Sequence, residues 1–163
     1  MMKKDSLIVV TGAAGFIGSC MVSLLNQLGY ENLIVVDEFS RADKMANLKG
    51  KSYAQQIQRD VFLQWLSENG STVKHIFHLG AKTDTTLQDQ ALFDALNLNY
   101  SKTVWQLCHQ YQIGLVYASS AATYGDGSYG YDDDESLIPN LKPLNKYGDS
   151  KNDFDIWALQ QDK

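Results

Sequence analysis

Short apolar runs rich in β-branched residues alternate with longer amphipathic stretches along most of this chain. The apolar runs are LIVVTG (7–12), LIVVDE (33–38), the weaker AQQIQRD (54–60), VKHIFHLGA (73–81) and IGLVYASS (113–120). The amphipathic stretches predict helices at about 15–28, 61–68 and 89–111. This alternation is typical of a parallel sheet with crossover helices on both faces, whose strands are apolar almost throughout because both sides are buried. We therefore expect an α/β protein with a Rossmann-like, doubly wound parallel sheet.

The carboxyl-terminal part of the chain departs from this alternation. Residues 125–145 are rich in Gly, Tyr, Asp and Asn and predict a loop. Its acidic run YDDDES (131–136) is typical of a solvated loop. The alternative prediction is that this run forms a lid over a ligand. The stretch NKYGDSKNDFDIWALQ (145–160) predicts a final helix. With 163 residues, 44% of them hydrophobic, the chain is expected to form one compact domain over residues 1–163.

Composition argues against several classes of partner. The formal net charge is −5 without any basic run, so we expect neither nucleic acid nor an anionic membrane to bind. No apolar run approaches the roughly 18 residues of a transmembrane helix, and LIVV is too short for a signal peptide, which predicts a cytoplasmic location. Cys20 and Cys108 lack metal-ligand spacing, which favours two packed, reduced thiols and no metal site. The oligomeric state, including a homo-oligomer, stays open.

The segment TGAAGFIG follows the first apolar run directly and opens the first helix. Gly12 permits a tight turn, Gly15 lets the backbone approach a pyrophosphate, and Gly18 lets helix and strand pack closely. The helix N-terminus, at Phe16 and Ile17, offers unpaired N–H groups and a partial positive charge to phosphates. The expected cofactor is therefore a dinucleotide.

Two acidic residues end the next two strands. Asp37 stands about twenty residues beyond the glycine turn, where a carboxylate accepts hydrogen bonds from an adenosine ribose or, alternatively, caps the next segment. Asp60, followed by Val61, is placed to lie near the adenine or to serve as the N-cap of a helix that starts at Val61.

The choice between NAD and NADP depends on the charges near a 2′-phosphate. A phosphate oxygen about 4 Å from the Asp37 carboxylate would be repelled by roughly 4 kcal/mol at an effective dielectric constant near 20, and Glu38 adds a second acidic group. Arg41 and Lys44 either offset this repulsion or are solvated loop charges. The sequence favours NADP slightly and leaves NAD open.

YGDSK places Tyr147 four residues before Lys151 on the predicted final helix. Residues four apart share a helix face, so the Lys151 ammonium can favour the phenolate form of Tyr147 and make it a general base. The spacing alone is common by chance, but YASSAATYG supplies a context for it. The fifth strand ends in Ser119 and Ser120 at the carboxyl edge of the sheet, where open α/β folds bind ligands. A serine hydroxyl there binds a substrate oxygen or, alternatively, caps a turn.

These segments, with HLGA (78–81) between them, resemble the extended short-chain dehydrogenase/reductase family, and within it the nucleotide-sugar epimerases. VVDEF, HLGAKTDTT, SSAATYG and KPLNKYGDSK are most similar to members that act on ADP-heptose. The resemblance implies that Ser120, Tyr147 and Lys151 are catalytic and that Lys151 also holds the nicotinamide ribose. It implies a cofactor site lined by the glycine turn and by Asp37, Lys44, Gly80, Ala81 and Asn97.

The implied activity is epimerisation of a nucleotide sugar by transient oxidation with NADP or NAD, namely inversion of an ADP-heptose at C6 for lipopolysaccharide core synthesis. A UDP-hexose 4-epimerase is an alternative, because it shares the catalytic residues. A 4,6-dehydratase is disfavoured, because Ser120-Ala121-Ala122 stand where those enzymes have Thr-Asp-Glu. Members of the family continue into a smaller substrate-binding domain, so we expect an amino-terminal part of a longer enzyme. A non-catalytic dinucleotide-binding module is the remaining alternative.

Overall fold

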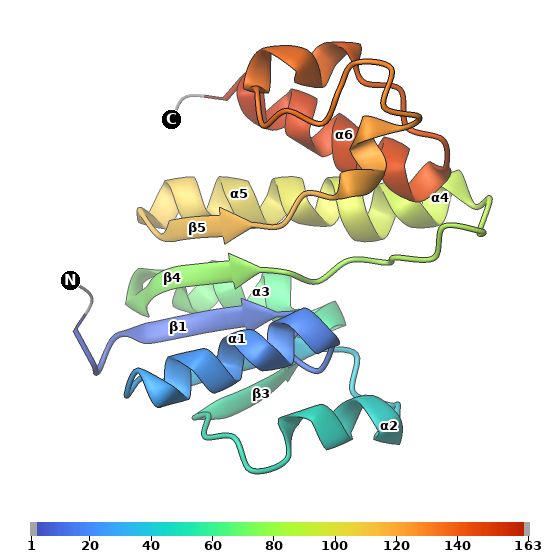
Figure 1. Ribbon diagram of the computed structural model, residues 1–163. Coiled ribbons are helices and arrows are strands. Elements are labelled where there is room, and N and C mark those ends of the chain that lie inside the picture. Colours follow the sequence, from blue (N-terminus) through green and yellow to red (C-terminus); the bar gives the residue numbers. More distant parts are fainter. Residues whose placement is uncertain (1–2, 162–163) are drawn as a thin grey trace. The chain divides into compact units, whose positions relative to one another are not determined.

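The computed structural model describes residues 3–161 and contains a five-stranded parallel sheet (Figure 1). Its strands are β1 (Leu7–Thr11), β2 (Leu33–Asp37), β3 (Gln55–Gln58), β4 (Val73–His78) and β5 (Gly114–Tyr117). They are ordered β3-β2-β1-β4-β5, and every neighbouring pair runs parallel. The predicted Rossmann-like α/β fold is confirmed.

The chain divides into two compact units. The first comprises the chain up to Gly80 together with Thr103–Ala118, and it holds the whole sheet. The second comprises Ala81–Lys102 and the chain from Ser119 onward. That both units act as one dinucleotide-binding domain over residues 1–163 stays a prediction.

Helices cover both faces of the sheet in the first unit. They are α1 (Phe16–Gln27), α2 (Ala42–Met45) with the 3₁₀ turn η1 (Ala46–Leu48), and α3 (Arg59–Asn69) with the 3₁₀ turn η2 (Gly70–Thr72). Most of α5 (Tyr100–Tyr111), from Thr103 onward, also belongs to this unit. Figure 1 shows α1 in front of the sheet and α3 behind it.

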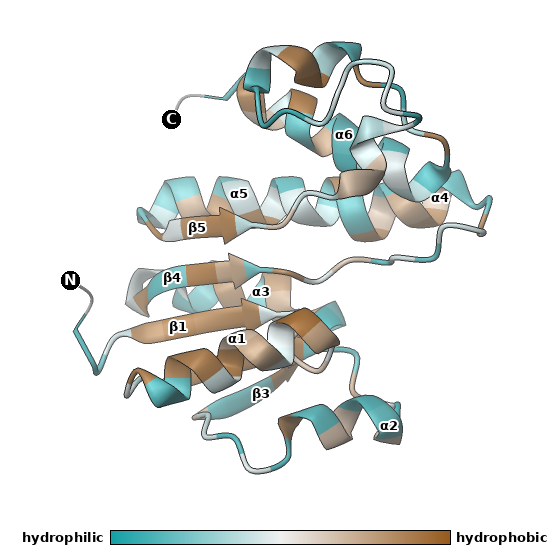
Figure 2. Cartoon of the chain, viewed as in Figure 1, coloured by the Kyte–Doolittle hydropathy of each residue, from teal (hydrophilic) through white to brown (hydrophobic). Residues whose placement is uncertain are grey.

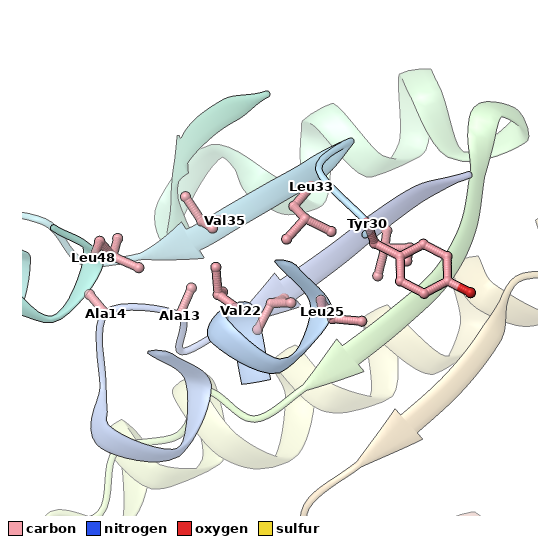
Figure 3. Packing of buried hydrophobic residues seen from close by; sticks show 10 residues of the cluster. Ala13, Ala14, Val22, Leu25, Tyr30, Leu33, Val35 and Leu48 are labelled. Atoms are coloured by element: carbon pink, nitrogen blue, oxygen red, sulfur yellow. The ribbon is translucent and has the colours of Figure 1, made fainter. Parts of the chain in front are cut away.

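Side chains that alternate along the strands fill the two sides of this unit. Ile8 and Val10 of β1 belong to a buried cluster with residues of α1, β2, η1 and the loops on either side of α1. Figure 3 labels eight of these residues: Ala13, Ala14, Val22, Leu25, Tyr30, Leu33, Val35 and Leu48. Val9, between Ile8 and Val10, is fully buried as well. By contrast β3 is an edge strand, largely hydrophilic in Figure 2, and buries only Ile57. Because three of its four residues are exposed, its sequence has only a weak strand pattern.

The second unit is built from helices and turns. They are α4 (Gln90–Phe93), the π-helical segment η3 (Asp94–Asn99), the first residues of α5, the 3₁₀ helices η4 (Ala121–Tyr124) and η5 (Glu135–Asn140), and α6 (Lys146–Leu159). The helix expected at 89–111 thus contains a π-helical segment, and the loop expected at 125–145 contains η5. The side chain of Asn145 caps α6 by accepting the Gly148 N–H at 2.8 Å.

The two cysteines differ in their surroundings. Both are free thiols, but Cys20 is exposed and Cys108 is buried. The prediction that both are packed is wrong for Cys20, because the buried face of α1 is formed by Gly18, Ser19, Val22 and Leu25. Burial raises the pKa of Cys108 to about 12. None of the helices in the described part of the chain has the length and apolarity needed to cross a membrane.

Candidate active site

The turn after β1 packs tightly against the segment that follows β4. Gly12 has a φ of +67°, and a Cβ on it would lie 2.7 Å from the Cα and N atoms of Gly80. The Gly80 N–H donates to Oγ1 of Thr11 at 3.1 Å, and the Thr11 hydroxyl lies 2.7 Å from Nδ1 of buried His78. Because Thr11 accepts from Gly80, its own hydrogen is available for His78. Only glycine fits at position 12 in this arrangement.

The N-terminus of α1 lies on this turn. A Cβ on Gly18 would lie 2.1 Å from the Gly12 carbonyl oxygen, whereas one on Gly15 would meet only that oxygen, at 3.2 Å. The helix has neither a side-chain cap nor an acidic residue in its first turn. Its first N–H groups, at Phe16 and Ile17, are therefore available to an anion. This arrangement fits the pyrophosphate of a dinucleotide.

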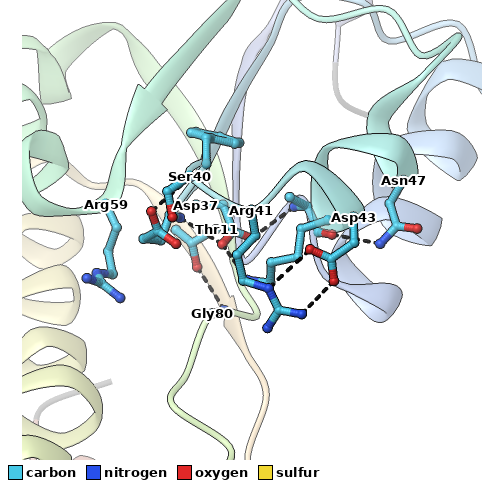
Figure 4. A network of polar contacts seen from close by, with 12 residues as sticks. Thr11, Asp37, Ser40, Arg41, Asp43, Asn47, Arg59 and Gly80 are labelled. Atoms are coloured by element: carbon cyan, nitrogen blue, oxygen red, sulfur yellow. Dashed lines mark hydrogen bonds and ion pairs between the residues drawn. The ribbon is translucent and has the colours of Figure 1, made fainter.

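The Asp37 carboxylate is buried at the end of β2 and accepts three hydrogen bonds. Oδ2 accepts the Ala14 N–H at 2.9 Å, while Oδ1 accepts the Glu38 N–H at 2.8 Å and lies 2.9 Å from Lys44 Nζ. Asn47 donates from Nδ2 to the Ala14 carbonyl at 2.9 Å, which fixes η1 to the turn (Figure 4). A carboxylate offers about four lone pairs, so one stays available for a ribose hydroxyl.

The other charged residues beside Asp37 are engaged elsewhere. Figure 4 shows Arg41 paired with Asp43, and both are exposed. Hydrogen bonds from Ser40 lower the pKa of Glu38, and the charge of Lys44 lowers it further. Of the two cations weighed for a 2′-phosphate, only Lys44 therefore contacts Asp37.

Asp60 and Val61 are exposed in the first turn of α3. The helix starts at Arg59, and its N-cap is Gln58, so the alternative that Asp60 serves as N-cap is wrong. The Asp60 carboxylate instead lies 2.8 Å from the Arg59 guanidinium. Contact of Asp60 and Val61 with an adenine stays a prediction.

In the second unit, Tyr147 and Lys151 occupy the first half of α6. Tyr147 is half-buried, and its phenol makes no hydrogen bond to any other described residue. Lys151 is only 4% exposed. Its burial lowers the pKa of the ammonium, and the charge of Asp155 opposes this by raising it.

Ser120 lies next to the first turn of α6. Its Oγ accepts the Ala122 N–H at 3.1 Å and so caps η4, while the hydroxyl hydrogen has no acceptor among the described residues. A Cβ on Gly148 would lie 2.8 Å from the Ala122 carbonyl oxygen, so α6 packs directly on η4. Ser120 therefore fills the predicted capping role and can still donate a hydrogen bond to a substrate.

Asn97 lies buried in the π-helical segment and joins two parts of the second unit. Its Oδ1 accepts the Lys82 N–H at 2.8 Å, and its Nδ2 donates to the Lys82 carbonyl at 3.0 Å and to Ser150 Oγ at 2.9 Å. Ser150 Oγ in turn donates to the Tyr147 carbonyl at 2.7 Å. Both amide hydrogens of Asn97 are thus used in holding the segment after Ala81 and the helix that carries Tyr147. A cofactor contact of Asn97 stays a prediction.

The structure also contains two side-chain pairs near the predicted site residues that the sequence analysis did not identify. One is Thr11 with His78, beneath the glycine turn. The other is Ser119 with Asp155, in which the serine hydroxyl donates to Oδ2 of the carboxylate. The one sequence feature that could have identified Asp155 is its position four residues after Lys151, which puts both residues on the same helix face.

The sheet order and the glycine turn on an uncapped helix are typical of the short-chain dehydrogenase/reductase type of protein. The chain belongs to the NAD dependent epimerase/dehydratase family, whose model matches residues 8–162. The predicted resemblance to nucleotide-sugar epimerases is confirmed.

Individual relatives agree with this assignment. The ADP-L-glycero-D-manno-heptose-6-epimerase of Fusobacterium nucleatum is 42% identical over 159 residues, which cover 95% of this chain and 48% of that protein. The solved structure of the Helicobacter pylori ADP-L-glycero-D-manno-heptose-6-epimerase has a TM-score of 0.77 at 24% identity and covers 98% of this chain and 53% of its own, a likeness of fold. The UDP-glucose 4-epimerase of Thermotoga maritima, solved with UDP-glucose, has a TM-score of 0.73 at 26% identity over 93% of this chain and 50% of its own. The chain spans about half the length of the curated relatives it matches.

Proposed function

We propose that this chain binds NADP or NAD and serves nucleotide-sugar epimerisation by transient oxidation, with ADP-D-glycero-D-manno-heptose inverted at C6. The observation that carries the proposal is the family match over residues 8–162, which includes both the glycine turn and the Ser120, Tyr147 and Lys151 set. The 42% identity to a heptose epimerase supports the choice of sugar.

The first unit would hold the nucleotide half of the cofactor. The backbone N–H groups of Phe16 and Ile17 would donate to the pyrophosphate, and the space beside Gly15 would accommodate it. The remaining lone pair of Asp37 would accept a ribose hydroxyl. Lys44 offsets the Asp37 charge, which supports our proposal that Lys44 would bind a 2′-phosphate and that NADP is slightly preferred.

The second unit would carry the proton transfer. A nicotinamide held here would supply reversible hydride transfer. Tyr147, as the phenolate, takes the proton from the sugar hydroxyl, and the Lys151 cation stabilises that phenolate. Ser120 donates its hydroxyl hydrogen to the substrate oxygen. Inversion would require the resulting ketone to turn its opposite face to the site, after which Tyr147 returns the proton to the oxygen.

Stereochemical conversion of ADP-D-glycero-D-manno-heptose tests this proposal. Because the chain spans about half of its relatives, the assay uses residues 1–161 joined to the unmatched carboxyl-terminal part of the Fusobacterium nucleatum relative. We expect turnover that Tyr147→Phe reduces at least about 100-fold, the usual contribution of a general base. Undiminished turnover in Tyr147→Phe would refute the catalytic assignment.

The likeness to the Thermotoga maritima UDP-glucose 4-epimerase favours a second candidate, a UDP-hexose 4-epimerase. UDP-glucose in the same assay separates the two, since conversion of that sugar alone supports this candidate. We also propose a cytoplasmic location, because the exposed free thiol of Cys20 suits a reducing compartment.

A further inference from the structure

A second buried charge lies beside the proposed catalytic lysine. Asp155 is 5% exposed and Lys151 is 4% exposed, and they stand four residues apart on α6. Asp153, between them in sequence, is exposed on another side of the helix. A carboxylate is rarely buried to this degree unless it is paired or hydrogen-bonded.

Asp155 is tied to the segment that carries Ser120. The hydroxyl of Ser119 donates to Oδ2 of Asp155, and Ser119 directly precedes Ser120, the cap of η4. The same carboxylate therefore contacts the strand-end segment and belongs to a residue that lies about one helical turn after Lys151.

We propose that Asp155 is a positioning residue, which Ser119 anchors and which keeps Lys151 as a cation beside Tyr147. What Lys151 does for Tyr147 rests on the proposed function. The coupling between Asp155 and Lys151 does not depend on it.

The charges of the second unit support this pairing. Burial lowers the pKa of Lys151, and the Asp155 carboxylate is the charge that raises it. The elements packed against α6 carry other titratable groups, Asp94 on η3, Tyr124 on η4 and Glu135 on η5. The charge of Asp94 acts on Asp153 instead. Burial raises the pKa of Asp153 most, and the charges of Asp149 and Asp94 raise it further.

The charges of Asp155 and Lys151 interact without forming a direct ion pair. Among the described residues, Lys151 makes no ion pair within 4.0 Å. A buried pair at such a separation still interacts measurably, because little water screens it. The expected signature is therefore a shift in titration.

NMR titration of the chain labelled with ¹³C and ¹⁵N in its lysine side chains tests the proposal. The Lys151 signal is assigned by its loss in Lys151→Met. We expect Asp155→Asn to lower the Lys151 midpoint by about one pH unit and Asp155→Glu to restore it. The matched control, Asp153→Asn, removes a neighbouring carboxylate that does not act on Lys151 and should leave the midpoint in place. An unchanged midpoint in folded Asp155→Asn would overturn the proposal.

A reciprocal measurement covers the case in which Asp155→Asn does not fold. Coupling is mutual, so Lys151→Met should raise the midpoint of the Asp155 carboxyl, followed by its ¹³Cγ signal. An Asp155 carboxyl that titrates identically with and without Lys151 would contradict the inference. Failure of the wild-type chain to bind NADP or NAD while this coupling persists would count against the proposed function alone.

Discussion

The ammonium of Lys44 lies 2.9 Å from Oδ1 of Asp37, at the end of β2. Asp37 is 7% exposed, and Lys44 is the cation that offsets its charge. A 2′-phosphate at this position would otherwise meet an unpaired carboxylate. The pair therefore links the acidic residue expected to bind ribose with the basic residue expected to recognise NADP.

Lys44→Ala should weaken binding of NADP by about 1.5–3 kcal/mol and leave NAD nearly unchanged, because the variant removes a charged hydrogen bond to the 2′-phosphate. Calorimetric titration with both cofactors measures the difference. Lys49→Ala, an exposed lysine in the same region, is the control and should leave both affinities unchanged. Equal losses for both cofactors in Lys44→Ala would refute this role.

Gly18→Ala should destabilise the chain by about 1–3 kcal/mol and abolish dinucleotide binding. Its new Cβ would lie 2.1 Å from the Gly12 carbonyl oxygen, so the helix must move away from the turn. Urea unfolding and cofactor titration report the two effects. Gly50→Ala is the control: it places a side chain at a φ of +76° in open space, costs about 1–2 kcal/mol, and should leave binding intact.

Thr11→Val should lower the free energy of unfolding by about 1–3 kcal/mol. Valine keeps the shape of threonine but leaves the Gly80 N–H and Nδ1 of His78 without the Thr11 hydroxyl, in a position that is 3% exposed. Thr72→Val, at an exposed position, should change the free energy by less than about 0.5 kcal/mol. Equal free energies of unfolding for Thr11→Val and Thr72→Val would show that the buried Thr11 hydroxyl does not stabilise the fold.

Cys108 should make stability depend on pH in alkaline solution. Burial raises the pKa of its thiol from 9.0 to about 12, so the unfolded chain releases this proton at lower pH than the folded chain does. Its contribution to stability is therefore complete below about pH 9 and declines as the pH rises toward about 12.

Urea unfolding at pH 8 and pH 10 checks this, with Cys108→Ala expected to lose less stability than wild type between the two values. Cys20→Ala should behave as wild type does, because Cys20 is exposed. An identical loss in Cys108→Ala and wild type would contradict the expected contribution.

Much of the fold follows from local patterns in the sequence. The β-branched runs and the TGAAGFIG turn predict β1, β2, β4 and α1, since burial on both faces leaves a strong signal. Positions that depend on distant neighbours are harder to predict. Cys20 looks like a core residue by composition but falls outside the stripe of α1 that faces the sheet.

The candidate site shows the same division. Gly12, Gly15 and Gly18 are recognisable because the turn needs them at fixed spacing. The partners of Asn97 cannot be read from sequence, because Lys82 and Ser150 lie 15 and 53 residues away along the chain. The hydrogen bond of Asp155 likewise cannot be predicted from sequence, because its partner Ser119 is 36 residues away.

Binding of a nicotinamide dinucleotide by the chain itself is the central claim, and calorimetric titration with NADP and NAD tests it most directly. We expect saturable heat from the wild-type chain and much weaker binding by Gly15→Ala, whose added Cβ occupies the space beside the helix N-terminus and meets only the Gly12 carbonyl oxygen, at 3.2 Å. Circular dichroism establishes that both samples are folded. Absence of heat at millimolar cofactor from a folded wild-type chain, or equal affinity in Gly15→Ala, would contradict the account.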